Sequence, residues 1–354
     1  MLKSLAALAA TIILASCASG LAKPPGPAAV DPASIGWNQR ALDEVVSYVG
    51  SQKSTGLVII EDNRIIVETY WPLPAGAENF RSGFVYGESS DGALLEDIAS
   101  QQKSFVAILA GIAIDKGLLD LSKSVSSYVG AGWSKAATDQ EAAITVRNLM
   151  EMNSGLKVDL TFDAAPGTKF LYNTPAYAIV KRVLEAASRQ PLDAITQDWL
   201  TKPAGMHDTS WRKRPARFAD VGNPTGLVTT PRDIARLGQL VLDGGVAADG
   251  VRVISKQQLN ALFLPTKINP SYGRLWWLNG DNQTGSATPA FPRHPGRFVT
   301  AAPADMIAAL GAQDRKLFVV PSRKLIVVRT GQAAPDRSIN DRMWELLDNA
   351  MPKH

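Results

Sequence analysis

Apolar residues along this chain repeat with a helical period in its middle and gather in short strand-like runs toward both ends. The clearest helical spacing, at i, i+3, i+4 and i+7, is that of Phe105, Ile108, Leu109 and Ile112. Lys116 and Gly117 then supply the cation and the glycine that commonly end such a helix. The pattern predicts a helix that begins near residue 100 and ends near residue 116.

Weaker patterns predict the other elements. Helices are expected over residues 37–49, 146–152, 177–187, 193–200, 231–242, 255–263 and 341–350. Strands are expected over residues 57–61, 64–70, 306–310, 317–320 and 325–328. Strand-like runs therefore return only near the end of the chain, after a long helical stretch.

Strands at both ends with helices between them favour an α/β (α+β) fold. We expect one antiparallel sheet, built from the N-terminal and C-terminal segments and flanked by helices, with a mainly helical insertion. Residues 35–93 and 265–354 would form the sheet domain, and residues 94–264 the helical domain. Ser100 would then lie at the junction of the two, where clefts commonly form.

The first residues are typical of an export signal. One cation, Lys3, precedes an apolar run that ends at Leu14 and is too short to cross a bilayer. We therefore expect residues 1–16 to be a cleaved signal peptide. Residues 17–34 are rich in Ala, Pro and Gly and are predicted to be a flexible tether.

The end of this signal, Leu14-Ala15-Ser16-Cys17, resembles the bacterial lipoprotein box, in which the cysteine becomes the lipid-bearing first residue of the mature chain. Cys17 is the only cysteine, which excludes an intrachain disulfide. Ala18 is not the aspartate that would favour the inner membrane. The resemblance implies a lipid anchor at Cys17, on the periplasmic face of the outer membrane. An ordinary cleaved signal is the alternative.

The distribution of charge bears on whether the chain binds nucleic acid. The chain has 37 Lys and Arg against 33 Asp and Glu, a formal net charge of +4, and removal of Lys3 with the signal leaves +3. These charges are spread along the chain, which does not favour nucleic acid as a partner. The one cluster, Arg212-Lys213-Arg214, is interpreted as a solvated loop.

Histidines supply little chemistry. His207, His294 and His354 are the only three and have no paired spacing, so we expect no metal site and no cofactor. No Gly-x-Ser-x-Gly elbow occurs in the chain. A Ser-His-Asp triad is therefore disfavoured, although His207-Asp208 could belong to one, and His207 is interpreted as a surface or structural residue.

Ser100 and Lys103 stand three residues apart where the predicted central helix begins. A serine in the first turn has a backbone N–H that the helix leaves free to bind an oxyanion. Lys103 lies one turn later on the same face and can take the serine proton if burial lowers its pKa by about 3 from about 10.4. The pair is a candidate nucleophile and base. A helix-capping serine with a solvated lysine is the alternative.

The same Ser-x-x-Lys spacing occurs twice more. Ser154 precedes Lys157, and Ser210 precedes Lys213. Glycine follows Ser154 at once, and cations and a proline follow Ser210, so neither serine opens an apolar helix. Only Ser100 has the setting that the chemistry needs.

Tyr172, in the stretch of residues 166–177, is the candidate for a second proton-transfer group. A phenol held near a lysine ammonium can lose or relay a proton more readily than a free tyrosine, because the positive charge favours phenolate. A half-buried tyrosine that only packs is the alternative.

Several motifs resemble, in order, those of the penicillin-recognising serine hydrolases. The closest branch is the class C β-lactamase-like one, with the family VIII carboxylesterases and the 6-aminohexanoate-dimer hydrolase-like proteins. The motifs lie at residues 98–104, 144–156, 166–177, 226–233, 272–277 and 327–331. The resemblance implies a β-lactamase/transpeptidase-like fold, with Ser100 as the acylated nucleophile, Lys103 as its proton partner and Tyr172 as the second-motif tyrosine. It also places Ser154 in a structural Ser-Gly-Leu turn.

Two motifs depart from that pattern. Many relatives have Tyr-x-Asn where this chain has Tyr172-Asn173-Thr174, so the Thr174 hydroxyl is expected to replace the amide in part. The third motif, Lys-Thr-Gly or His-x-Gly, has imitations at residues 294–296 and 329–331, which we interpret as a loop and as the end of a strand. We prefer residues 309–312, Ala-Leu-Gly-Ala, which resemble a segment of the 6-aminohexanoate-dimer hydrolase-like proteins.

The preferred segment implies a role for backbone. By the resemblance, the N–H of Ala312, next to Gly311, pairs with the N–H of Ser100 as the oxyanion hole. The segment has no cation to hold a β-lactam carboxylate, which argues against an efficient β-lactamase. Trp276 and Trp277 are candidates to line the acyl or leaving-group pocket, with core packing as the alternative.

The sequence thus predicts a serine hydrolase that cleaves a small-molecule ester or amide through an acyl-enzyme and needs no cofactor. A small ester is the first expected substrate, because esters have good leaving groups. An amide or oligoamide is second, and a β-lactam or cell-wall peptide third. A non-catalytic periplasmic binding or scaffold protein with the same fold is the alternative of another class. The membrane is a partner only through the lipid anchor, and the oligomeric state is left open.

Overall fold

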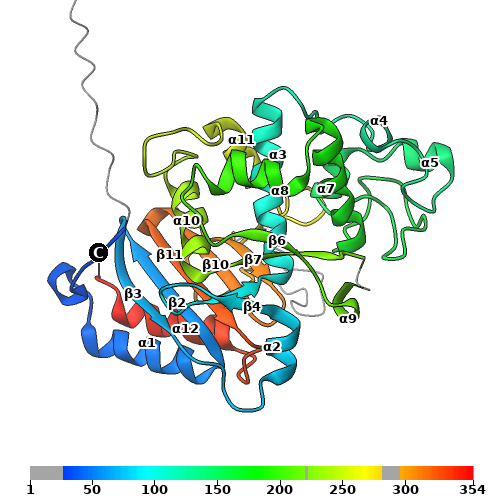
Figure 1. Ribbon diagram of the computed structural model, residues 1–354. Helices are drawn as coiled ribbons and strands as arrows, with labels where there is room; N and C mark the ends of the chain where they lie inside the picture. The colour runs from blue at the N-terminus through cyan, green and yellow to red at the C-terminus, as the bar shows by residue number, and fades with distance from the viewer. Residues whose placement is uncertain (1–26, 220–221, 281–295, 354) are drawn as a thin grey trace, which may run out of the picture.

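The computed structural model describes residues 27–219, 222–280 and 296–353 (Figure 1). The predicted signal peptide, Cys17, His294 and His354 lie outside the described residues. Strand β1 (Ala28–Ala29), in the segment predicted as a tether, pairs in parallel with the edge strand β3. The tether prediction is therefore wrong for its C-terminal end, because these residues hydrogen-bond to a sheet edge.

Strands from both ends of the chain form one seven-stranded sheet, as predicted. Its order is β1-β3-β2-β11-β10-β9-β8, and every pairing except that of β1 is antiparallel. The bounds are β2 Ser54–Glu61, β3 Arg64–Tyr70, β8 Trp277–Leu278, β9 Ile307–Gly311, β10 Arg315–Val320 and β11 Leu325–Gly331. The N-terminal strand β2 lies beside the C-terminal strand β11, and both are buried along their whole length, which explains their nearly continuous apolar runs.

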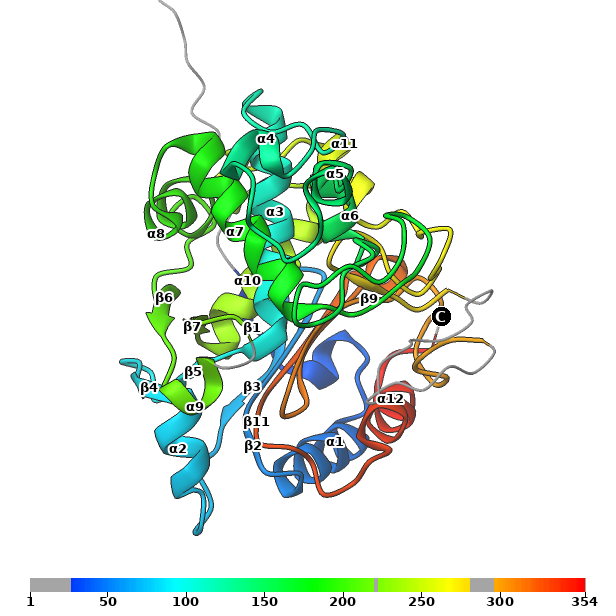
Figure 2. The same ribbon diagram turned by 90° about the vertical axis from the view of Figure 1, so that its right-hand side faces the viewer.

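Helices cover both faces of this sheet (Figure 2). Helices α1 (Gln39–Ser51) and α12 (Ile339–Ala350) pack together on one face. Helix α10 (Pro231–Leu242) packs on β2, β10 and β11 from the other face. The Thr230 hydroxyl accepts from the Asp233 N–H at 3.3 Å, and Pro231 is the first helical residue, so α10 begins where its capping sequence predicts.

Helix α3 (Gln102–Asp115) is the centre of the mainly helical part. It is buried from Gln102 to Ala113 and is enclosed by α7, α11 and β9, which suits a helix that is apolar on nearly every side. The other helices of this part are α4 Ser126–Val129, α5 Thr138–Ala142, α6 Val146–Met150, α7 Thr174–Ser188, α8 Leu192–Thr196, α9 Ala216–Ala219 and α11 Lys256–Leu262.

A second sheet interrupts the stretch that was expected to be helical. Its order is β4-β5-β7-β6, with β4 Val85–Glu88 after helix α2 (Glu78–Phe84), and with β5 Leu94–Asp97, β6 Ser210–Lys213 and β7 Thr225–Thr229. The prediction that strands return only near the C-terminus is therefore wrong. These strands have four or five residues, too few to show a period of two, and their pairing joins segments far apart in the sequence.

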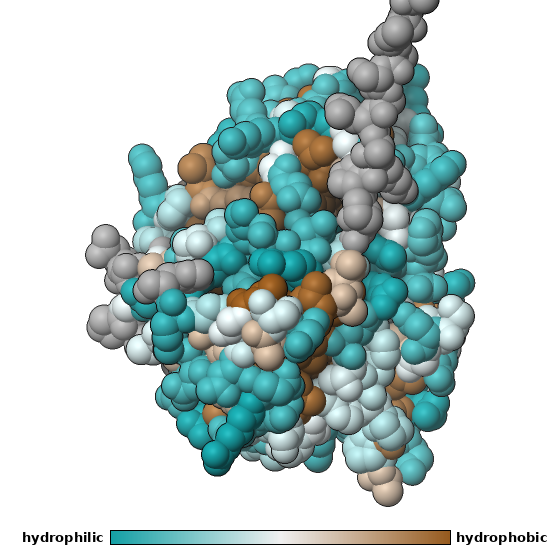
Figure 3. All heavy atoms as spheres, turned by 90° about the vertical axis from the view of Figure 1, so that its left-hand side faces the viewer, coloured by the Kyte–Doolittle hydropathy of each residue, from teal (hydrophilic) through white to brown (hydrophobic). Residues whose placement is uncertain are grey.

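Buried apolar side chains form one core that extends from the seven-stranded sheet through α3. The face in Figure 3 is mostly hydrophilic, with apolar side chains in separate patches. Among the described residues, no helix combines the length and the apolar content needed to cross a bilayer. The core holds the start of α3 against β9, and this is where the candidate nucleophile lies.

Candidate active site

Ser100 lies in a tight turn between β5 and α3. The turn is the 3-10 helix η2 (Ala99–Gln101), so Ser100 occupies the first turn as predicted, but that turn is 3-10 rather than α-helical. Ala99 has a φ of 51°, a left-handed conformation that costs a non-glycine residue about 1–2 kcal/mol. Its N–H donates to Asp97 Oδ1 at 2.8 Å, which holds the strained residue in place. Ser100 remains partly exposed, so a substrate can reach it.

Lys103 lies directly behind Ser100. Its Nζ is 2.9 Å from Ser100 Oγ and 3.3 Å from Thr174 Oγ1. The lysine is 2% exposed, and its Nζ stands 4.8 Å from the ring centroids of both Tyr172 and Tyr177. The amine is thus enclosed by hydroxyls and aromatic rings.

This environment favours the neutral amine. Burial lowers the pKa of Lys103 well below its ordinary value of 10.5, and the charges of Arg214 and Lys181 lower it further. A neutral amine 2.9 Å from the Ser100 hydroxyl can accept its proton, whereas an ammonium cannot. The structure supplies the burial that the proposed base requires.

Tyr172 lies beside the pair, with its ring centroid 4.8 Å from Lys103 Nζ. Burial raises the pKa of its phenol to about 12, and the interaction with the Ser100 side chain offsets part of that effect. The buried Lys103 favours its own neutral form, so no ammonium charge there favours the phenolate form of Tyr172. Near neutral pH Tyr172 is a protonated phenol, suited to donate or relay a proton.

The altered second motif changes which side chain faces Lys103. Asn173 points away from it: its Oδ1 accepts from the Ala176 N–H at 3.0 Å and caps α7, and its Nδ2 donates to two backbone carbonyls at 2.9 Å. Thr174 Oγ1 instead lies 3.3 Å from Lys103 Nζ. That the Thr174 hydroxyl takes part of the place of the amide stays a prediction, which this contact supports.

Gly311, the last residue of β9, lies against the turn that carries Ser100. A Cβ at this position would stand 2.3 Å from the Ile98 carbonyl oxygen, so only glycine lets β9 approach the turn this closely. Ala312 follows and is exposed, and its carbonyl accepts from Arg315 Nη1 at 2.9 Å. The segment preferred for the oxyanion hole therefore lies beside the nucleophile.

Two consecutive acids at the end of β5 hold this arrangement from opposite sides. Asp97 forms a buried bidentate ion pair with Arg214, with Nε to Oδ2 at 2.6 Å and Nη2 to Oδ1 at 2.9 Å. Glu96 accepts from Arg315 Nε at 3.1 Å, and both side chains are fully buried. Successive side chains of a strand point to opposite faces. Asp97 therefore supports the turn that carries Ser100, whereas Glu96 supports Arg315, which donates to the Ala312 carbonyl.

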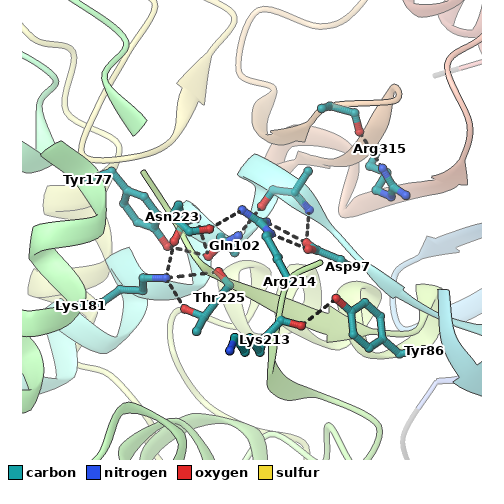
Figure 4. Close-up of polar contacts among 12 residues, drawn as sticks. Tyr86, Asp97, Gln102, Tyr177, Lys181, Lys213, Arg214, Asn223, Thr225 and Arg315 are labelled. Atoms are coloured by element: carbon teal, nitrogen blue, oxygen red, sulfur yellow. Dashed lines mark hydrogen bonds and ion pairs between the residues drawn. The ribbon is translucent and has the colours of Figure 1, made fainter. Parts of the chain in front are cut away.

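The interpretation of residues 212–214 as a solvated loop is wrong for Arg214. It was predicted to lie in a solvated loop, but it is 8% exposed and also donates to the Asn223 carbonyl at 3.2 Å (Figure 4). Gly226 lies so close that a Cβ there would stand 2.1 Å from an Asp97 carboxylate oxygen. Sequence reasoning missed Arg214 because a run of cations before a proline is typical of a surface. The one available signal was the pair of acids just before Ser100.

The two candidate pocket tryptophans have different surroundings. Trp277, in β8, stacks on Tyr172 with ring centroids 5.7 Å apart and planes 22° apart. Trp276 is fully buried, with its ring edge-on to that of Phe263 at 5.4 Å. Trp277 therefore contacts Tyr172, whereas Trp276 belongs to the core.

The remaining candidates lie elsewhere. Residues 329–331 end β11, as predicted, and Arg329 donates there to backbone carbonyls. His207 lines a cavity of about 480 Å³ between α10 and strands β2 and β3, which Ser100, Lys103 and Tyr172 do not line. In residues 27–219, 222–280 and 296–353, no group of three or more His, Cys, Asp or Glu side chains is placed to hold a metal ion.

Comparisons with known proteins agree with this fold. The Beta-lactamase family model matches residues 42–348. The "Putative D-alanyl-D-alanine carboxypeptidase" of Escherichia coli strain K12 is 21% identical over 361 aligned positions, which cover 79% of this chain and 81% of that protein. Two solved structures are similar at 15% identity. The "putative beta-lactamase" of Bacteroides dorei DSM 17855 has a TM-score of 0.66 and covers 89% of this chain and 99% of its own. The "Putative 6-aminohexanoate-dimer hydrolase" of Bacillus anthracis has a TM-score of 0.63, and the match covers 92% of this chain and 86% of that protein.

Replacing Lys103 with methionine should abolish hydrolysis yet stabilise the fold. Methionine has a similar length and carries no amine to desolvate, so the free energy of unfolding at neutral pH should rise by about 0.5–2 kcal/mol. The pKa of Lys103 is lower in the folded than in the unfolded chain, so the wild type gains stability as the pH rises toward 10.5. The difference between the two proteins should therefore shrink with rising pH, as measured by urea unfolding.

Lys123→Met is the control, because Lys123 is exposed and its loss should change the free energy of unfolding by less than about 0.5 kcal/mol at every pH. A Lys103→Met protein that is less stable than the wild type at neutral pH would contradict the argument from burial.

Proposed function

This chain belongs to the β-lactamase family of serine hydrolases, and on that premise we propose that it is an esterase-like enzyme that works through an acyl-enzyme at Ser100. The observation that carries the proposal is the 2.9 Å contact between Ser100 Oγ and the amine of the buried Lys103. A buried amine whose pKa is lowered destabilises the fold at neutral pH. Its place beside a partly exposed serine is therefore better explained by reactivity than by packing.

In the proposed reaction, Lys103 takes the Ser100 proton while Oγ attacks the substrate carbonyl carbon. The backbone N–H groups of Ser100 and Ala312 hold the oxyanion of the tetrahedral intermediate. The intermediate collapses to acyl-Ser100, and the leaving group takes a proton from the Lys103 ammonium through the Tyr172 phenol. Water then attacks the acyl carbonyl and gives its proton to Lys103. Release of the acid returns a proton to Ser100 Oγ.

We place esters first among the substrates. The Tyr172 phenol, with its pKa raised to about 12, is a weak acid, and the alcohol that leaves an ester needs less help from an acid than the amine that leaves an amide. The end of β9 beside Ser100 carries Ala309 and Leu310 rather than a cation. This segment therefore suits a substrate without a carboxylate near the scissile bond.

An amide or oligoamide is the second candidate. It is supported by the similarity to the Bacillus anthracis protein, whose name refers to the hydrolysis of 6-aminohexanoate dimer. A D-alanyl peptide, supported by the name of the Escherichia coli relative, ranks third, as does a β-lactam. The ratio of kcat/KM for p-nitrophenyl acetate to that for p-nitroacetanilide separates the first two candidates, and a ratio near one would favour the amide.

Ser100→Ala should eliminate both the adduct with a fluorophosphonate and the turnover of p-nitrophenyl acetate. The loss of kcat/KM should be at least about 1,000-fold, because no other group can form the acyl-enzyme. Intact-mass spectrometry of the chain from Ala18 measures the adduct. Ser154→Ala is the matched control: it removes the serine of another Ser-x-x-Lys sequence, whose hydroxyl accepts from the Leu156 N–H at 3.3 Å, and it should keep both adduct and turnover.

A folded wild type that gives neither adduct nor turnover would contradict the enzyme and would favour a non-catalytic binding or scaffold protein. An adduct that persists in Ser100→Ala would assign the nucleophile to another residue.

We also propose that the chain is exported and carries a lipid on Cys17. The support is the sequence Leu14-Ala15-Ser16-Cys17 after a short apolar run, with no other cysteine in the chain. The lipid would attach the enzyme to the periplasmic face of the outer membrane, through residues 18–27.

Expression of the full chain in a Gram-negative host with labelled palmitate should give a labelled protein in the outer-membrane fraction. Cys17→Ser should lose the label and leave the membrane fraction, because a lipid chain contributes about 0.8 kcal/mol of membrane affinity for each buried CH₂ group. A Cys17→Ser protein that keeps its label, or an unlabelled wild type, would contradict lipidation at this residue.

A further inference from the structure

A second buried lysine lies near the catalytic pair. Lys181, on α7, is 6% exposed. Its Nζ donates to Asn223 Oδ1 at 2.5 Å, to Thr225 Oγ1 at 2.7 Å and to the Thr225 carbonyl at 3.3 Å (Figure 4). All three acceptors are neutral, so none of them cancels the charge of a Lys181 ammonium.

Two links connect Lys181 to Lys103. Asn223 Nδ2 and the Tyr177 hydroxyl both donate to Gln102 Oε1 at 3.3 Å, and Gln102 directly precedes Lys103 in α3. The Tyr177 ring is shared as well, because its centroid lies 4.8 Å from Lys103 Nζ and 5.8 Å from Lys181 Nζ. The two amines are therefore no more than about 11 Å apart, the sum of those distances.

Several elements contribute charged or titratable groups around the two lysines. Those near Lys103 or Lys181 are Ser100, Asp97, Tyr172, Tyr177, Glu185 and Arg214. Arg214 forms an ion pair with Asp97, and, in addition to burial, its charge lowers the pKa of Lys103 together with the charge of Lys181. Burial and the charge of Arg214 lower the pKa of Lys181 to about 7, although Asp97 and Glu185 raise it. Below about pH 7, Lys181 is thus an ammonium with neutral hydrogen-bond partners.

We propose that Lys181 is a positioning residue that keeps Lys103 in its neutral, proton-accepting form. An ammonium at Lys181 raises the free energy of a second positive charge at Lys103, and the Gln102 bridge and the Tyr177 ring fix the distance over which this repulsion acts. The inference rests on the proposed function, in which Lys103 is the base for Ser100.

The pH dependence of kcat/KM for p-nitrophenyl acetate tests this role. The acid limb is the fall of kcat/KM at low pH, where Lys103 takes up a proton. Lys181→Met removes a positive charge that opposes this protonation, so it should move the acid limb to higher pH. The shift should be up to about 1 pH unit, the effect expected of a unit charge at about 11 Å in a medium of dielectric constant about 20. Lys181→Arg keeps the charge and should retain the limb of the wild type. Asn223→Asp places a carboxylate against Lys181 and should move the limb in the same direction as Lys181→Met, without removing the lysine.

Lys316→Met is the matched control. Lys316, on β10, is 1% exposed, burial lowers its pKa to about 7, and its Nζ donates to Asn340 Oδ1 at 2.5 Å. It resembles Lys181 in burial and in its asparagine partner, but it contacts α12 rather than α7 and α3. Its replacement should leave the acid limb in place.

The rate of fluorophosphonate labelling at Ser100, followed over the same pH range, is a second readout that needs no turnover. An acid limb that Lys181→Met leaves unchanged in both assays, in a variant that circular dichroism shows to be folded, overturns the inference. A lower kcat without that shift would mark Lys181 as structural. A wild type that shows neither turnover nor labelling contradicts the proposed function itself, and the inference falls with it.

Discussion

The burial of the Lys103 amine is the constraint on which the site depends. A lysine that is 2% exposed and surrounded by hydroxyls and aromatic rings favours the neutral form, and only that form lets a 2.9 Å contact activate the Ser100 hydroxyl. Burial also keeps the Tyr172 phenol protonated, so of the two groups proposed for proton transfer, Lys103 starts in the form that accepts a proton and Tyr172 in the form that donates one. The proposed role of Lys103 as the base explains why a destabilising buried amine stands at this position.

The short strand β5 fixes the geometry around that amine. The Asp97 side chain binds two groups near the four-stranded sheet, the guanidinium of Arg214 and the N–H of the strained Ala99. Glu96 faces the seven-stranded sheet, where it binds Arg315, the residue that holds the Ala312 carbonyl. Both sheets are thereby tied to the turn that carries the nucleophile, and the two N–H groups proposed for the oxyanion hole are supported by neighbouring side chains of one strand.

The sequence predicts the features whose signal is local. The strands near both ends follow from their apolar runs, and α10 begins and ends at the predicted residues because its cap stands in the sequence. The Ser100 and Lys103 pair follows from spacing at a helix start. The missed features depend on contacts between distant segments: Arg214 binds a residue 117 positions earlier, and the pKa of Tyr172 depends on a burial that no local pattern reveals.

The most direct test of this account is the ionisation of Lys103 itself. Carbon-13 NMR of labelled lysine follows each side-chain amine with pH, and the spectrum of Lys103→Met assigns the resonance. We expect Lys103 to titrate well below 10.5, so that its amine is neutral under conditions in which Ser100 reacts. A Lys103 that titrates near 10.5 in a protein whose Ser100 is still acylated would contradict the account, because another group would then have to take the serine proton.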